Sequence, residues 1–273
     1  MTPSNPNTTS FIHGLSIKDA YVKLDVEIAQ LETRLSSLKT LRNSLAPISK
    51  IPTEILTKMF RHCYEPSEFP FSEDLDVNTR FFISWVCRHW RDTALATPNL
   101  WTIISKKSSE VRLHVDFVQE LLIRSRGLNL ALNLYKPSRA VLGACLSEIS
   151  HTQHLQLLST RSSTELNALL SQPASALVSL DLSDYSNLEL SLSSAHYPNL
   201  LQLTVSRSPL SAISPLMAPT LTSLELVKIY NLGVNYLVTV LPSIPNLTEL
   251  VLVECFRNEI VAPPPQRLDH SSL

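Results

Sequence analysis

Glycine is scarce in this chain. Its 273 residues include four glycines, and no two of them are closer than 16 positions. The GxGxxG fingerprint, the phosphate-binding P-loop and the GxSxG nucleophile elbow all need glycines a few positions apart. The sequence therefore excludes three of the commonest enzyme signatures, and no other nucleophile–base constellation stands out. We expect no catalytic activity and no cofactor.

The chain also lacks an excess of charge and a long apolar run. The 23 basic and 24 acidic residues give a net charge of −1, so there is no electrostatic argument for binding nucleic acid or an anionic membrane. No apolar run approaches the roughly 18–20 residues of a membrane span. Residues 1–14 are polar and have no apolar core, which is typical of a disordered tail and not of a signal peptide. We expect a cytoplasmic or nuclear protein.

Paired cysteines are missing as well. The four cysteines are far apart and form no CxxC motif, so we expect free thiols in a reducing compartment. His62 and Cys63 are adjacent, and adjacent residues of a helix point about 100° apart, which keeps them from chelating one ion together. We therefore expect no metal site.

Residues 15–46 have the period of a long amphipathic helix. One position of each heptad is apolar throughout: Ile17, Leu24, Leu31, Leu38 and Leu45. A second position is apolar in Tyr21, Ile28 and Leu35, until Arg42 ends the series. This pattern predicts a helix of roughly 45 Å. Two interpretations stay open, a coiled coil that forms a homodimer and a single helix that folds back on the neighbouring domain.

Residues 47–104 have the pattern of a compact helical unit. Pro52 stands where the first position of a helix is expected. The apolar residues behind it fall on one face of a helix: Ile55, Leu56, Met59, Phe60 and Cys63. Residues 65–77 hold two prolines and five acids, which indicates a loop. A second helix is expected from Asn78 or Thr79 to Thr97, with Phe82, Val86, Trp90 and Ala94 along one side.

The C-terminal part, residues 105–273, repeats a leucine motif. LxxLxL occurs at residues 177–182, 200–205, 221–226 and 247–252, with looser copies at 128–130 and 155–157. The steps of 23, 21 and 26 residues lie in the range of leucine-rich repeats, which place one strand in each repeat. Another step of 26 leads to Leu273, and residues 263–273 do not resemble a capping repeat. We therefore expect the array to be incomplete at its C-terminus, with an open edge near residues 247–253.

Two segments of the helical unit resemble an F-box. IPTEILTKMFRHC contains the LPxEIL-type start, with Ile51 in place of leucine, and the apolar pair Met59-Phe60. FISWVCRHWRDTALATPNLW contains VCRxWR and the late LW pair, together with all three tryptophans of the chain. The resemblance covers about 50 residues, and the long acidic loop departs from it. A leucine-rich helix before the box and irregular leucine repeats after it are similar to a large group of fungal F-box proteins.

The resemblance implies a fold and a partner. The fold would be a multi-region α+β chain with a long N-terminal helix, a three-helix F-box over 47–104 and a leucine-rich-repeat-like α/β solenoid of short parallel strands. The F-box would bind the Skp-type adaptor of a cullin–RING ubiquitin ligase, and Trp90 would fill the centre of its core, with Trp85 and Trp101 nearer the edge. By position, the adaptor-binding candidates are Ile51, Pro52, Ile55, Leu56, Met59, Phe60, Val86, Cys87, Trp90, Pro98 and Trp101.

The resemblance also implies a function. The chain would be a substrate receptor of that ligase, with the leucine repeats binding an unknown target protein. The alternative is a scaffold that binds the adaptor and has no role in ubiquitination.

Overall fold

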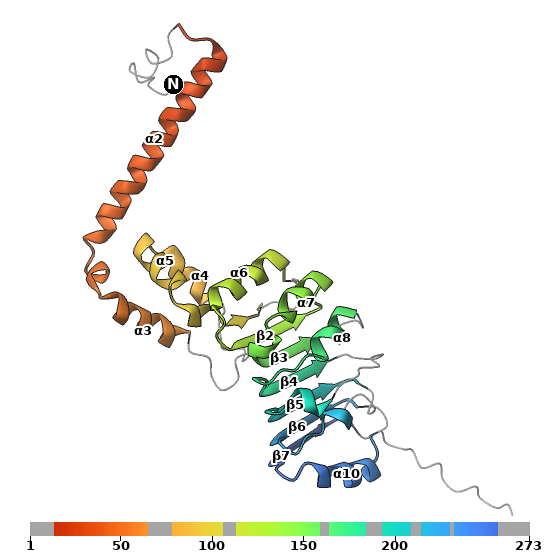
Figure 1. Ribbon diagram of the computed structural model, residues 1–273. Helices are drawn as coiled ribbons and strands as arrows, with labels where there is room; N and C mark the ends of the chain where they lie inside the picture. Colours follow the sequence, from red (N-terminus) through yellow and green to blue (C-terminus); the bar gives the residue numbers. More distant parts are fainter. Residues whose placement is uncertain are drawn as a thin grey trace, which may run out of the picture. The chain divides into compact units, whose positions relative to one another are not determined.

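The computed structural model describes residues 14–64, 78–105, 113–158, 164–183, 193–208, 214–229 and 232–255. Of these, 14–63 and 80–96 form one compact unit and the others form a second (Figure 1). The fold class is α+β, with a long N-terminal helix and one parallel sheet of seven strands. Except for Gly14, the expected tail at 1–14 and the expected loop at 65–77 lie outside the described residues.

The long helix α2 (Ile17–Ser44) confirms the helix predicted from the heptads. It begins where the Ser16 hydroxyl accepts a hydrogen bond from the backbone N–H of Asp19 at 3.2 Å, because the first turn of a helix lacks internal acceptors. No residue of α2 is buried. The coiled coil and the helix that folds back on the neighbouring domain both stay predictions.

The first unit continues with η2 (Pro47–Lys50), α3 (Thr53–Cys63), α4 (Thr79–Trp85) and α5 (Arg88–Leu95). Pro52 directly precedes α3, and its carbonyl accepts the first backbone hydrogen bonds of that helix.

The single helix expected between residues 78 and 97 is wrong, because the chain breaks it into α4 and α5. Cys87 is fully extended and becomes the N-cap of α5. The Ser84 carbonyl, near the end of α4, accepts a hydrogen bond from Arg91 Nε at 3.0 Å. A side chain thus satisfies an acceptor that the continuing helix would have used.

The second unit is built on a parallel sheet whose strands follow one another in sequence order. The strands are β1 (Ile103–Ile104), β2 (Leu130–Tyr135), β3 (Thr152–Leu158), β4 (Ser179–Ser183), β5 (Gln202–Ser206), β6 (Ser223–Val227) and β7 (Glu249–Val253). Each LxxLxL copy contains the start of a strand. The C-terminal limit of the array, residues 256–273, lies outside the described residues.

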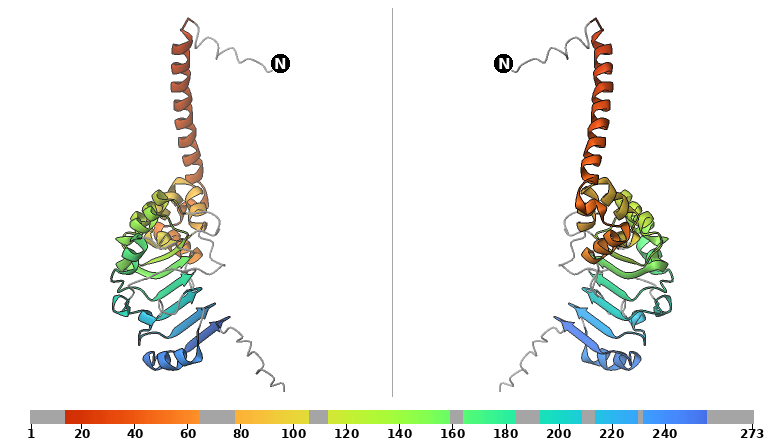
Figure 2. Two further views of the ribbon diagram at one scale, coloured as in Figure 1. Left: turned by 90° about the vertical axis from the view of Figure 1, so that its right-hand side faces the viewer. Right: turned by 90° about the vertical axis from the view of Figure 1, so that its left-hand side faces the viewer.

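Short helices connect the strands. Three of them, α6 (Val115–Ser125), α7 (Arg139–Leu146) and α8 (Thr164–Leu170), lie on one side of the sheet (Figure 2). The helix α10 (Val234–Val240) precedes β7. Single 3-10 turns lie directly before five of the strands: η3 (Pro98–Trp101) before β1, η4 (Ile149–His151) before β3, η5 (Ser194–His196) before β5, η6 (Ser214–Leu216) before β6 and η7 (Leu241–Ser243) before β7.

The strand leucines form ladders inside the second unit. Leu155, Leu180, Leu203 and Leu224 are register partners on successive strands, and each is at most 1% exposed. Leu250 is the next rung, on β7, and it is 38% exposed. Burial of a leucine side chain contributes about 1.5–3 kcal/mol, so the ladder stabilises the inner strands more than β7.

Left-handed residues follow several strands. Lys136, Arg207, Lys228 and Glu254, each directly after a strand, have φ between 43° and 52°. The backbone N–H of Lys228 donates to the Val253 carbonyl on the next strand at 2.7 Å, and the first two residues make equivalent hydrogen bonds. These ladder hydrogen bonds offset the cost of a conformation that long side chains rarely adopt.

Candidate functional site

The helix α3 carries apolar side chains on two sides. Leu56 and Phe60 are buried, with 0% and 2% of their surface exposed, whereas Ile55 and Met59 are 46% and 41% exposed. Adjacent residues of a helix point about 100° apart, so both pairs cannot be buried against the same neighbour. The apolar face expected for this helix is therefore divided, with Leu56 and Phe60 buried and Ile55 and Met59 open to solvent.

The end of α4 carries a second group of exposed apolar side chains. Phe82, Trp85 and Val86 are 53%, 66% and 55% exposed. The rings of Phe82 and Trp85 meet edge to face, with centroids 5.6 Å apart. Because the helix breaks after Trp85, Phe82 and Val86 do not continue into one helix with Trp90 and Ala94. Phe82 and Trp85 were missing from the candidates, although the clustering of all three tryptophans in one segment pointed to them.

Trp90 on α5 does not fill the centre of the helical unit as expected, because it is partly exposed. Its ring packs on Phe60, with the ring centroids 5.1 Å apart and the planes at 60°. The indole N–H is shielded from solvent and has no hydrogen-bond acceptor among the residues that the structure describes. Such a buried donor costs about 1–3 kcal/mol, so Trp90 contributes through its ring and not through its polar atom.

The remaining candidates are divided between the two units. Ile51 and Cys87 are partly exposed and Pro52 is exposed, all in the first unit. Pro98 and Trp101 belong to the second unit. Trp101 is 0% exposed, and the guanidinium carbon of Arg124 lies 4.9 Å from its ring centroid. The expectation that Trp101 lies near an edge is therefore wrong, because this residue is part of the core.

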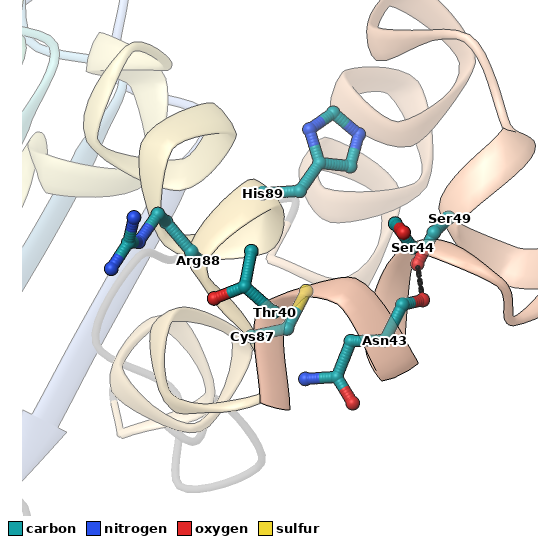
Figure 3. Close-up of a pocket in the computed structure, with 7 residues that line it drawn as sticks. All are labelled: Thr40, Asn43, Ser44, Ser49, Cys87, Arg88 and His89. Carbon is teal, nitrogen blue, oxygen red and sulfur yellow. Dashed lines mark hydrogen bonds between the residues drawn. The ribbon is translucent and has the colours of Figure 1, made fainter. Parts of the chain in front are cut away.

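A small polar pocket lies within the first unit (Figure 3). Its volume is about 190 Å³, and it is lined by side chains of α2, η2 and the start of α5, among them Cys87, Arg88 and His89. At its edge the Ser49 hydroxyl donates to the Asn43 carbonyl at 2.7 Å. No carboxylate is among the residues that line this pocket.

A polar column runs across the side of the sheet that faces away from the leucine ladders. Gln156, Asp181, Thr204 and Glu225 are register partners on β3 to β6. The Gln156 amide donates to Asp181 Oδ2 at 2.7 Å, and the Ser183 hydroxyl donates to Oδ1 at 3.0 Å. Burial raises the pKa of the Asp181 carboxyl above its ordinary value, the two hydrogen bonds oppose this rise, and the nearby Glu225 adds to it.

The described residues hold no metal-binding group and no membrane helix. No cluster of three or more His, Cys, Asp or Glu side chains there could hold a metal ion. None of the helices described has both the length and the apolar character needed to cross a membrane. The four cysteines are free thiols.

Comparison with known proteins adds no assignment. No protein-family model matches the chain, and no curated protein sequence matches it. The F-box resemblance therefore rests on the two quoted motifs.

Proposed function

We propose that this chain is the substrate receptor of a cullin–RING ubiquitin ligase and that its first unit is an F-box that binds a Skp-type adaptor. The observation that carries the proposal is the set of exposed apolar side chains on α3 and at the end of α4. These are Ile55, Met59, Phe82, Trp85 and Val86, each at least 41% exposed. Large aromatic anchors surrounded by aliphatic side chains are typical of the residues that dominate binding energy.

The proposal changes which residues touch the adaptor. Leu56 and Phe60 are at most 2% exposed, so they support the surface and do not contact the partner, and the buried Trp101 belongs to the second unit. Trp85 and Phe82 take their place as contacts, because their edge-to-face pairing holds two aromatic rings at the surface.

Adaptor affinity tests this assignment. The full chain should bind a purified Skp-type adaptor in calorimetry, and Trp85→Ala should weaken that binding by about 30-fold or more, the loss expected for a central aromatic anchor. Ile123→Ala is the matched control, because Ile123 is 71% exposed on α6 of the second unit. It should bind as the unaltered chain does. The proposal is refuted if the adaptor does not bind the unaltered chain, or if it binds Trp85→Ala as tightly as Ile123→Ala.

The second unit would be a leucine-rich-repeat solenoid that presents the target. Its support is the order of the parallel strands and the coincidence of strands with LxxLxL copies. The polar column from Gln156 to Glu225 would form part of the target surface. The chain would supply no catalytic side chain and would act by holding the target near a ubiquitin-charged enzyme.

A target stabilised when the gene is deleted would distinguish this receptor from a scaffold that binds the adaptor alone. The comparison needs two strains, one without the gene and one with the Trp85→Ala chain. A receptor predicts the same accumulating proteins in both, whereas a scaffold predicts none in either.

A further inference from the structure

The longest helix of the chain exposes its apolar stripe. The stripe comprises the two apolar heptad positions of α2, and no member is buried in the described chain. Its most exposed members are Ile17, Tyr21, Ile28, Leu31, Leu35, Leu38 and Leu45, with 51–80% of their surface open to solvent. A continuous exposed apolar stripe of this kind marks a site for another protein.

The charges beside the stripe oppose a parallel homodimer. In a parallel coiled coil, the residue just before the heptad position of Tyr21, Ile28 and Leu35 faces the partner residue five positions later in the sequence. With the chain facing itself in register, Glu27 therefore meets Glu32, and Arg34 meets Lys39. Two-fold symmetry repeats each contact, so all four charged contacts are between like charges. Arg42, at an apolar position, meets its own copy in the seam.

An antiparallel homodimer is little better. In that arrangement the residues just after the heptad position of Ile17, Leu24, Leu31 and Leu38 face each other. Full overlap of the two helices places Asp25 against Glu32 and Lys18 against Lys39. The opposite side of the seam gives one attractive contact, Glu27 with Arg34. Like-charged contacts thus outnumber attractive ones by two to one.

We infer that α2 is one of the two helices of a heterotypic parallel coiled coil, whose other helix belongs to a partner of different sequence. That helix has apolar heptads, basic residues opposite Glu27 and Glu32, and acidic residues opposite Arg34 and Lys39. Like charges against a second copy and opposite charges toward the partner give specificity from the same four side chains. The inference concerns the first helix only and does not depend on adaptor binding.

A charge-reversed version of the full chain is the probe. Glu27→Lys, Glu32→Lys, Arg34→Glu and Lys39→Glu together leave the stripe and the net charge of −1 unchanged. Each chain alone keeps like-charged contacts, whereas a mixture of the two has only attractive ones. Light scattering should give 30.5 kDa for either protein alone and twice that mass for the mixture. Adding Leu31→Ser and Leu38→Ser to the reversed chain should abolish the doubling.

A second variant tests the same contacts within one protein. Reversing only Glu27 and Arg34, as Glu27→Lys with Arg34→Glu, makes both contacts attractive between identical chains. This variant should form a homodimer, whereas the unaltered chain stays monomeric at the same concentration. The inference is overturned by an unaltered chain that is already a dimer, by a mixture that stays monomeric, by doubling that survives loss of the stripe leucines, or by a monomeric double variant.

Discussion

Trp90 offers a substitution whose outcome depends on which part of its side chain contributes. Trp90→Phe keeps an aromatic ring against Phe60 and removes the indole N–H, which has no acceptor in the described part of the chain. The loss of apolar area is offset by removal of a buried donor that costs about 1–3 kcal/mol. We therefore expect the free energy of unfolding of Trp90→Phe to lie within about 1 kcal/mol of that of the unaltered chain. Trp90→Ala also loses an aromatic pair of about 0.5–1.5 kcal/mol and the packing of a large side chain.

Trp90→Ala should cost about 2–4 kcal/mol, somewhat below the usual range for a fully buried tryptophan because Trp90 is partly exposed. Hydrogen exchange of the α5 amides, read by mass spectrometry, measures this loss in the first unit without requiring the whole chain to unfold. Trp85→Ala is the control, because Trp85 is 66% exposed and its truncation should change exchange little. A Phe variant that exchanges as fast as the Ala variant would show that the indole N–H does contribute, and the reasoning would be wrong.

Three further predictions concern the second unit. Burial, with a contribution from Glu148, raises the pKa of the Cys145 thiol to about 12, so iodoacetamide should label the exposed Cys63 well before Cys145, and equal labelling rates would contradict this. The free energy of unfolding should also fall as pH rises from about 9 toward 12, because only the thiol of the unfolded chain ionises in that range. Asp181→Asn should raise the melting temperature at pH 7 and have a smaller effect near pH 4, because the raised pKa of the Asp181 carboxyl means that its carboxylate form opposes folding. If the variant and the unaltered chain differ in melting temperature by the same amount at both pH values, that cause is excluded. The backbone amides of β7 should exchange hydrogen faster than those of β5, because Leu250 is 38% exposed and Leu203 only 1%. Equal protection of the two strands would show that burial of the ladder leucines does not determine strand stability.

The long helix and the positions of the strands could be predicted because each follows from one repeated spacing. Apolar residues every seven positions, without proline or glycine, favour α2. Leucines at alternate positions, repeated every 21 to 26 residues, favour strands that stack in register. In both cases the signal is local, and many residues agree on it.

The break between α4 and α5 could not be predicted in the same way. Residues 79–96 contain neither proline nor glycine, and Phe82, Val86, Trp90 and Ala94 keep a helical spacing through the break. What the sequence does not reveal is the hydrogen bond from Arg91 to the Ser84 carbonyl, which depends on where α5 lies after the turn. Phe82 and Val86 lie beside that break, and both are exposed.

Burial of Trp101 shows a related limit. Leu100-Trp101 lies at the end of the segment that resembles an F-box, and the resemblance alone associates it with the helical unit. In the structure it belongs to the second unit, beside β1 and under the Arg124 guanidinium. A motif assigns residues to a family position, whereas burial depends on the segment that follows them, here 103–125.

The chemistry of the sheet surface depends on register more than on sequence neighbours. Asp181 lies three positions before Asp184 in the sequence, yet its hydrogen-bond partners are Ser183 on its own strand and Gln156, 25 residues earlier on β3. Alternation along a strand indicates only that Asp181 faces away from the leucines. The pKa rise of its carboxyl needs the next strands as well, because Glu225 is brought near by two steps of parallel pairing. Repeat spacing therefore predicts which residues face outward, and the register of neighbouring strands decides how those residues act on one another.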